Sequence, residues 1–104
     1  MQRHPNEFSR RQIGRFFTER QVEVEVKTVD YGYVIFFQHF SSLEGCTVKE
    51  PAGRLIYDES SQDWMLYWIS STWRWHLYER FDRLDRALEV MFSDQAANLF
   101  HKVL

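Results

Sequence analysis

The chain has 104 residues, 44% of them hydrophobic and 17% aromatic, and it carries a formal net charge of −2. This length and apolar content predict a single domain, residues 1–104, with its own core rather than a disordered segment. The net charge argues against a general nucleic-acid binder, and a single cysteine excludes an internal disulfide. With no apolar run typical of a secretory signal or a membrane span, we expect a cytoplasmic protein that binds no membrane.

The first predicted element is a helix over about residues 10–20. Ser9 is a suitable N-cap with Gln12 three residues later, and Phe8 and Ile13 occupy the positions of a hydrophobic staple. The first twenty residues hold five arginines against two glutamates, so this helix is basic.

The middle of the chain is predicted to form strands. Residues 22–29 alternate valine with charged residues, which predicts a half-buried antiparallel strand. After a turn at 30–32, residues 33–40 are apolar on both faces, which predicts a strand inside the sheet. Residues 41–53 contain two glycines and a proline and predict a loop with a short strand near residues 47–48.

Three more strands are predicted over residues 54–60, 64–70 and 73–80, and the C-terminal part is predicted to be helical. Asp82 is a plausible N-cap for an apolar stripe at helical spacing, with a break at Ser93 before a second short stripe. The predicted fold is therefore α+β. It comprises an N-terminal helix, an about five-stranded, mostly antiparallel meander, and one or two C-terminal helices packed on the tryptophan-rich face.

All four tryptophans lie in the predicted hairpin of the fourth and fifth strands. With a turn centred on Ser71 and Thr72, Trp68 faces Trp75 across the hairpin. One face then carries Trp64, Leu66, Trp68, Trp73, Trp75 and Leu77. Leaving this set in water would risk aggregation, so we expect the tryptophans in the core, with Trp68 and Trp75 as buried neighbours.

The other face of this hairpin is the candidate interaction face. Its candidate residues are Tyr67, Arg74, His76, Tyr78 and Arg80. Tyrosine and arginine are enriched at interfaces, and the sheet has apolar residues on both faces with too few helices to cover both. We expect a second copy, giving a homodimer or other homo-oligomer, or an unidentified protein partner. Cover by a helix of the same chain, a nucleic-acid site and a small-ligand site are the alternatives.

No catalytic, cofactor-binding or metal-binding residue is predicted. The glycines are isolated, the histidines do not fall at metal-ligand spacing, no serine lies in a nucleophile elbow, and Cys46 has no base nearby in sequence. The favoured function is a non-catalytic protein-interaction or assembly module without a cofactor. A nucleic-acid-binding module that uses the Arg/Tyr face and the basic N-terminal helix comes second, and an enzyme comes third.

The C-terminal half, from about Gly53, resembles a small bacterial family of unknown function. Its members carry a strand of the type A-x-x-x-Y, then W-x-L-Y-W, a short turn, W-H-x-Y, a helix and a terminal aromatic residue. The matching residues are Tyr57, Trp64, Leu66, Tyr67, Trp68, Trp75, His76, Tyr78, Leu88, Asp94 and Phe100. The resemblance implies a small bacterial protein of this fold, with no activity or cofactor attached.

Overall fold

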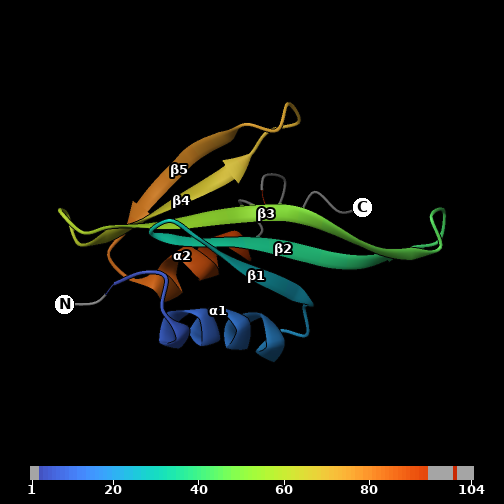
Figure 1. The fold of residues 1–104 in the computed structure, drawn as a ribbon, viewed down its shortest axis with the longest axis horizontal. Coiled ribbons are helices and arrows are strands. Elements are labelled where there is room, and N and C mark those ends of the chain that lie inside the picture. Colours follow the sequence, from blue (N-terminus) through green and yellow to red (C-terminus); the bar gives the residue numbers. More distant parts are fainter. Residues whose placement is uncertain (1–2, 94–99, 101–104) are drawn as a thin grey trace.

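The computed structural model describes residues 3–93 and 100 (Figure 1). Along the chain the elements are α1 (Glu7–Glu19), β1 (Val24–Val29), β2 (Gly32–Ser41), β3 (Cys46–Asp58), β4 (Asp63–Ile69), β5 (Trp75–Phe81) and α2 (Leu84–Met91). The strands form one antiparallel sheet in the order β1-β2-β3-β4-β5, which confirms the predicted α+β meander. The second C-terminal stripe predicted after Ser93 lies, apart from Phe100, outside the described residues.

Both helices lie on the same face of the sheet (Figure 1). On this side, Ile13 and Phe17 of α1 and Leu88 of α2 are completely buried. They belong to one apolar cluster with residues from all five strands, including Tyr33 and Leu66. Each large apolar side chain buried in this way contributes roughly 1.5–3 kcal/mol, so the helices are held mainly by this face of the sheet.

Both helices start at residues other than those predicted. Asn6 caps α1, and its Oδ1 accepts a hydrogen bond of 2.8 Å from the Ser9 backbone N–H. The predicted cap, Ser9, is therefore wrong, and the staple is wrong too, because the Phe8 side chain is 75% exposed. Likewise α2 has Arg83 at its N-cap instead of Asp82, without a side-chain capping bond.

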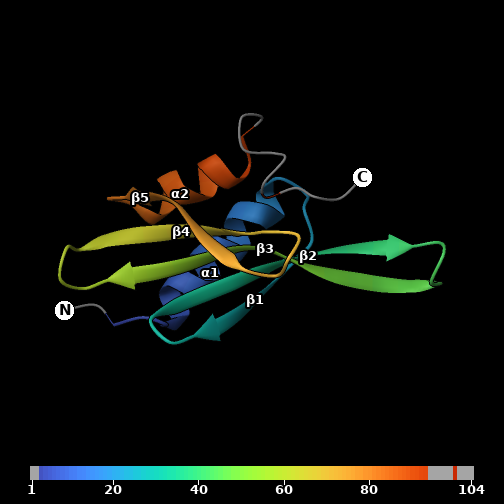
Figure 2. The same cartoon turned by 90° about the horizontal axis from the view of Figure 1, so that it is seen from above.

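The prediction of a loop over residues 41–53 is wrong. Strand β3 already begins at Cys46, and together with β2 it forms a long ribbon that projects from the body of the protein (Figures 1 and 2). Pro51 is tolerated because it lies at a register irregularity of the β2–β3 pair, where the hydrogen-bond ladder is disrupted. Strand β4 pairs only with residues 54–58 of β3, so Pro51 removes no bond to a third strand.

The β4–β5 hairpin has a different register from the predicted one. A bulge after Leu66 places Trp68 opposite His76, and Trp75 opposite Ile69. The turn is also longer than two residues, because the Ser70 N–H donates to the Arg74 carbonyl at 2.9 Å. Trp68 and Trp75 are therefore not cross-strand neighbours, and their predicted pairing is wrong.

The bulge distributes the tryptophans between the core and the surface. Trp64 is 5% exposed and belongs to the core, whereas Trp73 lies in the turn and is 72% exposed. Trp68 is partly buried against the core, and Trp75 is partly buried on the opposite face. The prediction that all four tryptophans are core residues is wrong for Trp73 and Trp75.

We expect Trp64→Ala to lower the free energy of unfolding by about 3–5 kcal/mol, because it leaves a large cavity in the core. The matched Trp73→Ala variant should change it by less than about 0.5 kcal/mol, because that ring is exposed. Urea unfolding followed by circular dichroism measures both values. Equal losses in the two variants would contradict this division of the tryptophans.

Candidate interaction surface

The predicted interaction residues do not share one face of the sheet. Tyr67 and Arg80 lie on the side opposite the helices, where their cross-strand partners are Leu77 and Met65. Partners directly opposite each other in an antiparallel pair share a face, so these four side chains form one surface.

The other three predicted residues lie elsewhere. The His76 ring stacks on Trp68 with centroids 4.8 Å apart, and Tyr78 meets the buried Phe100 ring edge-on at 5.5 Å. Both therefore lie on the helix side of the sheet. Arg74 is an exposed residue next to the β4–β5 turn. The predicted common face is wrong because the bulge shifts the pairing of β4 and β5 by one residue, so the side chains of His76 and Tyr78 point to the face opposite the predicted one. A binding role for any of these residues stays a prediction.

The side of the sheet opposite the helices is largely apolar, and we call it the open face. The strand registers place on it Val29, Val34, Phe36, Ile56, Met65, Tyr67, Ile69, Trp75 and Leu77, together with the charged Glu25, Lys27, Arg54, Asp58, Asp63 and Arg80. No helix of the described part of the chain lies against this face, and the β4–β5 hairpin leans toward it, away from the helices (Figure 1). Leu77 is 48% exposed, so part of this apolar surface is in contact with solvent.

Two cations lie among the aromatic rings of the open face. The guanidinium carbon of Arg54 is 5.9 Å from the centroid of Tyr67, and Lys27 Nζ is 5.2 Å from the centroid of Phe36. The Nε atom of Arg54 is buried and has no hydrogen-bond partner. A buried donor without a partner is costly, so the position of Arg54 is set by the packing of its side chain against Tyr67 and not by a hydrogen bond of Nε.

Arg80, at the edge of the open face, is already neutralised. Its Nη1 lies 3.2 Å from Asp58 Oδ2 and 3.0 Å from Asp63 Oδ1. Hydrogen bonds from Ser60, which have the largest effect, and from Arg80 hold the pKa of Asp58 far below its usual range. This cluster keeps Arg80 from acting as an unpaired cation for a phosphate group.

His4 is a buried residue that the sequence did not indicate. Its ring lies 4.7 Å from Tyr57 and 4.6 Å from Trp64, centroid to centroid, and its Nδ1 is 3.3 Å from the Tyr33 hydroxyl. Burial lowers the pKa of His4, and the charge of Glu59 opposes this shift only partly. No local pattern signals such a site, because its aromatic partners lie 29 or more residues away in the sequence.

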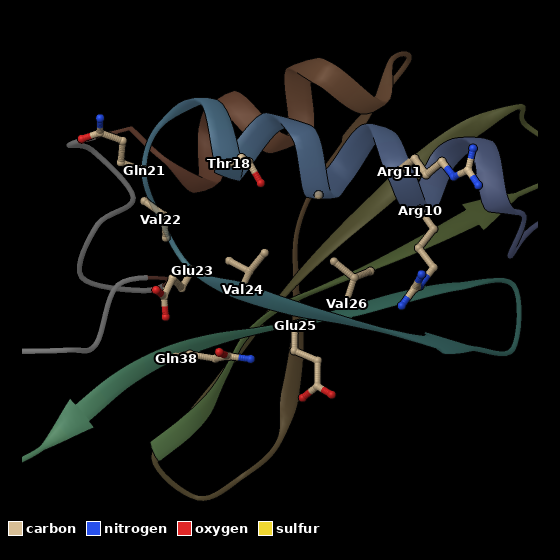
Figure 3. Close-up of a pocket in the computed structure, with 11 residues that line it drawn as sticks. Arg10, Arg11, Thr18, Gln21, Val22, Glu23, Val24, Glu25, Val26 and Gln38 are labelled. Atoms are coloured by element: carbon tan, nitrogen blue, oxygen red, sulfur yellow. The ribbon is translucent and has the colours of Figure 1, made fainter. Parts of the chain in front are cut away.

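A second surface lies at the edge strand β1. A groove of about 740 Å³ separates this strand from α1, and Val24 and Val26 point toward the helix while Glu25 points away from it (Figure 3). On the helix, the groove is lined by Gly14 and Thr18. A Cβ atom at Gly14 would meet nothing within 4 Å, so the groove is open at this point.

The described residues contain neither a metal site nor a membrane-spanning helix. Among residues 3–93 and 100, no three His, Cys, Asp or Glu side chains are grouped closely enough to hold a metal ion. Within the same residues, no helix has the length and apolar character needed to cross a membrane. Cys46 is exposed near the tip of the β2–β3 ribbon.

The fold and these surfaces define an α+β protein with one helix-covered sheet face, one open face and a grooved edge. Residues 1–101 match the family described as Domain of unknown function (DUF3024), and the chain belongs to this family. The match confirms the resemblance to a small family of unknown function and extends it to the N-terminal half. No curated protein and no solved structure matches the chain significantly.

We expect Asp58→Asn to be less stable than the wild type at pH 7. Because the pKa of Asp58 is lower in the folded protein than its ordinary value of 3.8, its stabilising effect is present above that value and is lost as the pH falls below it. The difference in unfolding free energy should therefore shrink as the pH falls from about 4 toward about 2 in urea titrations, because the carboxylate is protonated first in the unfolded chain. Asp82→Asn, at an exposed carboxylate 3.9 Å from Arg86, is the control. A difference that stays constant with pH would contradict the assignment.

Proposed function

We propose that this protein is a non-catalytic interaction module whose open face binds a partner protein. The observation that carries the proposal is an apolar, aromatic sheet face that neither α1 nor α2 covers. Leu77 is exposed and Tyr67, Met65 and Trp75 are half-buried on this face. An apolar surface that reaches solvent in this way can serve as an interaction site. We place the protein in the cytoplasm, because the exposed, unpaired Cys46 suits a reducing compartment.

The chemistry of the open face supports a partner segment that is apolar and carries an acidic group. Tyr67, Trp75 and Leu77 offer the aromatic and aliphatic contact area that dominates interface energies. The guanidinium group of Arg54, beside the Tyr67 ring, would donate to a carboxylate of the partner. An Arg–carboxylate bond enclosed by apolar contacts would fix the position of the partner segment.

Native mass spectrometry of the protein purified from its own host tests this proposal. We expect a co-purifying protein that is lost with Leu77→Asp, because a charge would be buried in the interface, and weakened roughly 30-fold with Tyr67→Ala. Arg54→Leu should weaken it as well, whereas Arg54→Lys should retain part of the binding.

The matched control is Leu43→Asp, which introduces the same charge at a residue that is 99% exposed at the tip of the ribbon. It should leave the partner bound. Loss of the partner with Leu43→Asp and retention with Leu77→Asp would contradict the open face as the binding site, as would purification without any partner.

A nucleic-acid-binding module is the second candidate. The pairs Lys27–Phe36 and Arg54–Tyr67 place cations beside rings on which bases could stack. The net charge of −2 and the ion pairs of Arg80 argue against nucleic-acid binding. We therefore rank it below the protein-binding module.

Fluorescence anisotropy with single-stranded oligonucleotides separates the two candidates. We expect no binding of oligo(dT) or oligo(U) at low salt. A nucleic-acid function would instead require affinity that falls with salt, with a log–log slope near −1.4 for two phosphate contacts at about 0.7 each. It would also require Lys27→Ala with Arg54→Ala to lower that slope. Such a result would reverse the ranking.

A further inference from the structure

We propose that β1 pairs in antiparallel fashion with β1 of a second copy, so that the two five-stranded sheets join into one continuous sheet. This inference goes beyond the proposed function, because β1 forms the edge of the sheet farthest from the β4–β5 hairpin. It assigns a specific partner, a second copy of the chain, to the grooved edge.

The outer edge of β1 presents regular backbone hydrogen-bonding groups. The Gln38 N–H donates to the Glu23 carbonyl at 3.1 Å, so the backbone groups of Glu23 point toward β2. Because these directions alternate along an antiparallel strand, the backbone groups of Val24, Val26 and Thr28 point away from the sheet. No other strand of the described chain pairs with this side, and β1 has neither a proline nor a register shift to block pairing.

The charges along β1 favour one register for this pairing, the one that places opposite charges across from each other at both Glu25 and Lys27. When the two-fold axis passes through Val26, Glu25 lies opposite Lys27 of the second copy, and Lys27 lies opposite its Glu25. An axis through Glu25 or through Lys27 would instead place like charges directly opposite each other, which is destabilising. In the Val26 register both Glu–Lys pairs occupy non-hydrogen-bonded positions, where side chains approach most closely.

The geometry of Glu25 suits this register. Its Oε2 lies 2.9 Å from Lys49 Nζ, which holds the carboxylate on the open face side of β1. A carboxylate can accept hydrogen bonds from two ammonium groups, so Lys27 of the second copy can join this ion pair. Lys27 itself lies on the same face, above the Phe36 ring.

The groove provides room on the other side of the strand. Val24, which is half-buried, and Val26 line the groove together with Gly14. In the proposed register, Val24 and Thr28 of the second copy lie beside Thr28 and Val24 of the first, on the helix side of the sheet. The absence of a side chain at Gly14 leaves space there for the added strand, which would cover apolar surface now exposed to solvent.

Charge exchange tests the inference with the full-length chain. Sedimentation equilibrium should show the wild type in a concentration-dependent balance between the 12.7 kDa chain and its dimer. Glu25→Lys alone and Lys27→Glu alone each turn both cross-strand pairs into like-charge pairs, so each should raise the dimer dissociation constant roughly tenfold or more. The double variant E25K/K27E restores opposite charges across both positions but loses the Glu25–Lys49 ion pair, so it should recover most of the dimerisation that either single variant loses.

Mixing the two single variants tests whether their loss of dimerisation comes from charge repulsion or from unfolding. In the mixed pair, both positions again join a lysine with a glutamate, so an equimolar mixture should form heterodimers although neither variant dimerises well alone. A variant that had merely unfolded would not be rescued by its counterpart.

Three results would overturn the inference: a monomer at every concentration, a dimer unaffected by the single substitutions, or a mixture that fails to dimerise. Leu77→Asp on the open face should leave the dimer intact. A dimer abolished by Leu77→Asp and unaffected by the charge variants would assign self-association to the open face instead. Loss of a co-purifying partner in that variant tests the proposed function separately, so the two proposals can fail independently.

Discussion

The hydroxyl group of Tyr33 connects the N-terminal arm, helix α1 and the centre of the sheet. The hydroxyl oxygen accepts a hydrogen bond of 2.8 Å from the Asn6 N–H, and the O–H group donates one of 3.1 Å to the Asn6 carbonyl. Asn6 in turn caps α1, so the start of the helix is tied to a fully buried side chain of β2. Burial raises the pKa of Tyr33, which keeps the hydroxyl protonated and able to donate. The orientation of α1, and with it the shape of the groove along β1, depends on this contact.

Because α1 and α2 lie on one side, no helix among residues 3–93 covers the other side of the sheet. The bulge after Leu66 determines which aromatic side chains of the hairpin lie on the helix side and which lie on the open face. Trp68 continues the packing of the helix side, whereas Tyr67 and Trp75 extend the open face. The aromatic-rich hairpin therefore has two roles: one set of rings stabilises the fold, and the other forms the surface proposed to bind a partner.

The two proposed interactions are compatible with each other. Pairing through β1 would join the sheets edge to edge and leave both open faces uncovered on the same side of the continuous sheet. A dimer would then present two copies of the binding face, and a bivalent partner would gain apparent affinity through a high effective concentration. The projecting β2–β3 ribbon adds a further exposed region, with Phe40 and Leu43 near its tip.

The sequence by itself determined the helix–meander–helix order and the alternation along β1, because both follow from local periodicity that each segment carries alone. It could not place the bulge after Leu66, since that register depends on which side chains the helices must cover. The extension of β3 through Pro51 could not be predicted from local sequence either. Pairing with β2 outweighs the local preference of these residues for a loop. Local sequence also could not reveal the aromatic site around His4, which residues far apart in the chain build together. The order of the strands is decided only in the tertiary structure. It places β1 at an edge of the sheet, where its alternating charges are available for pairing with a second copy.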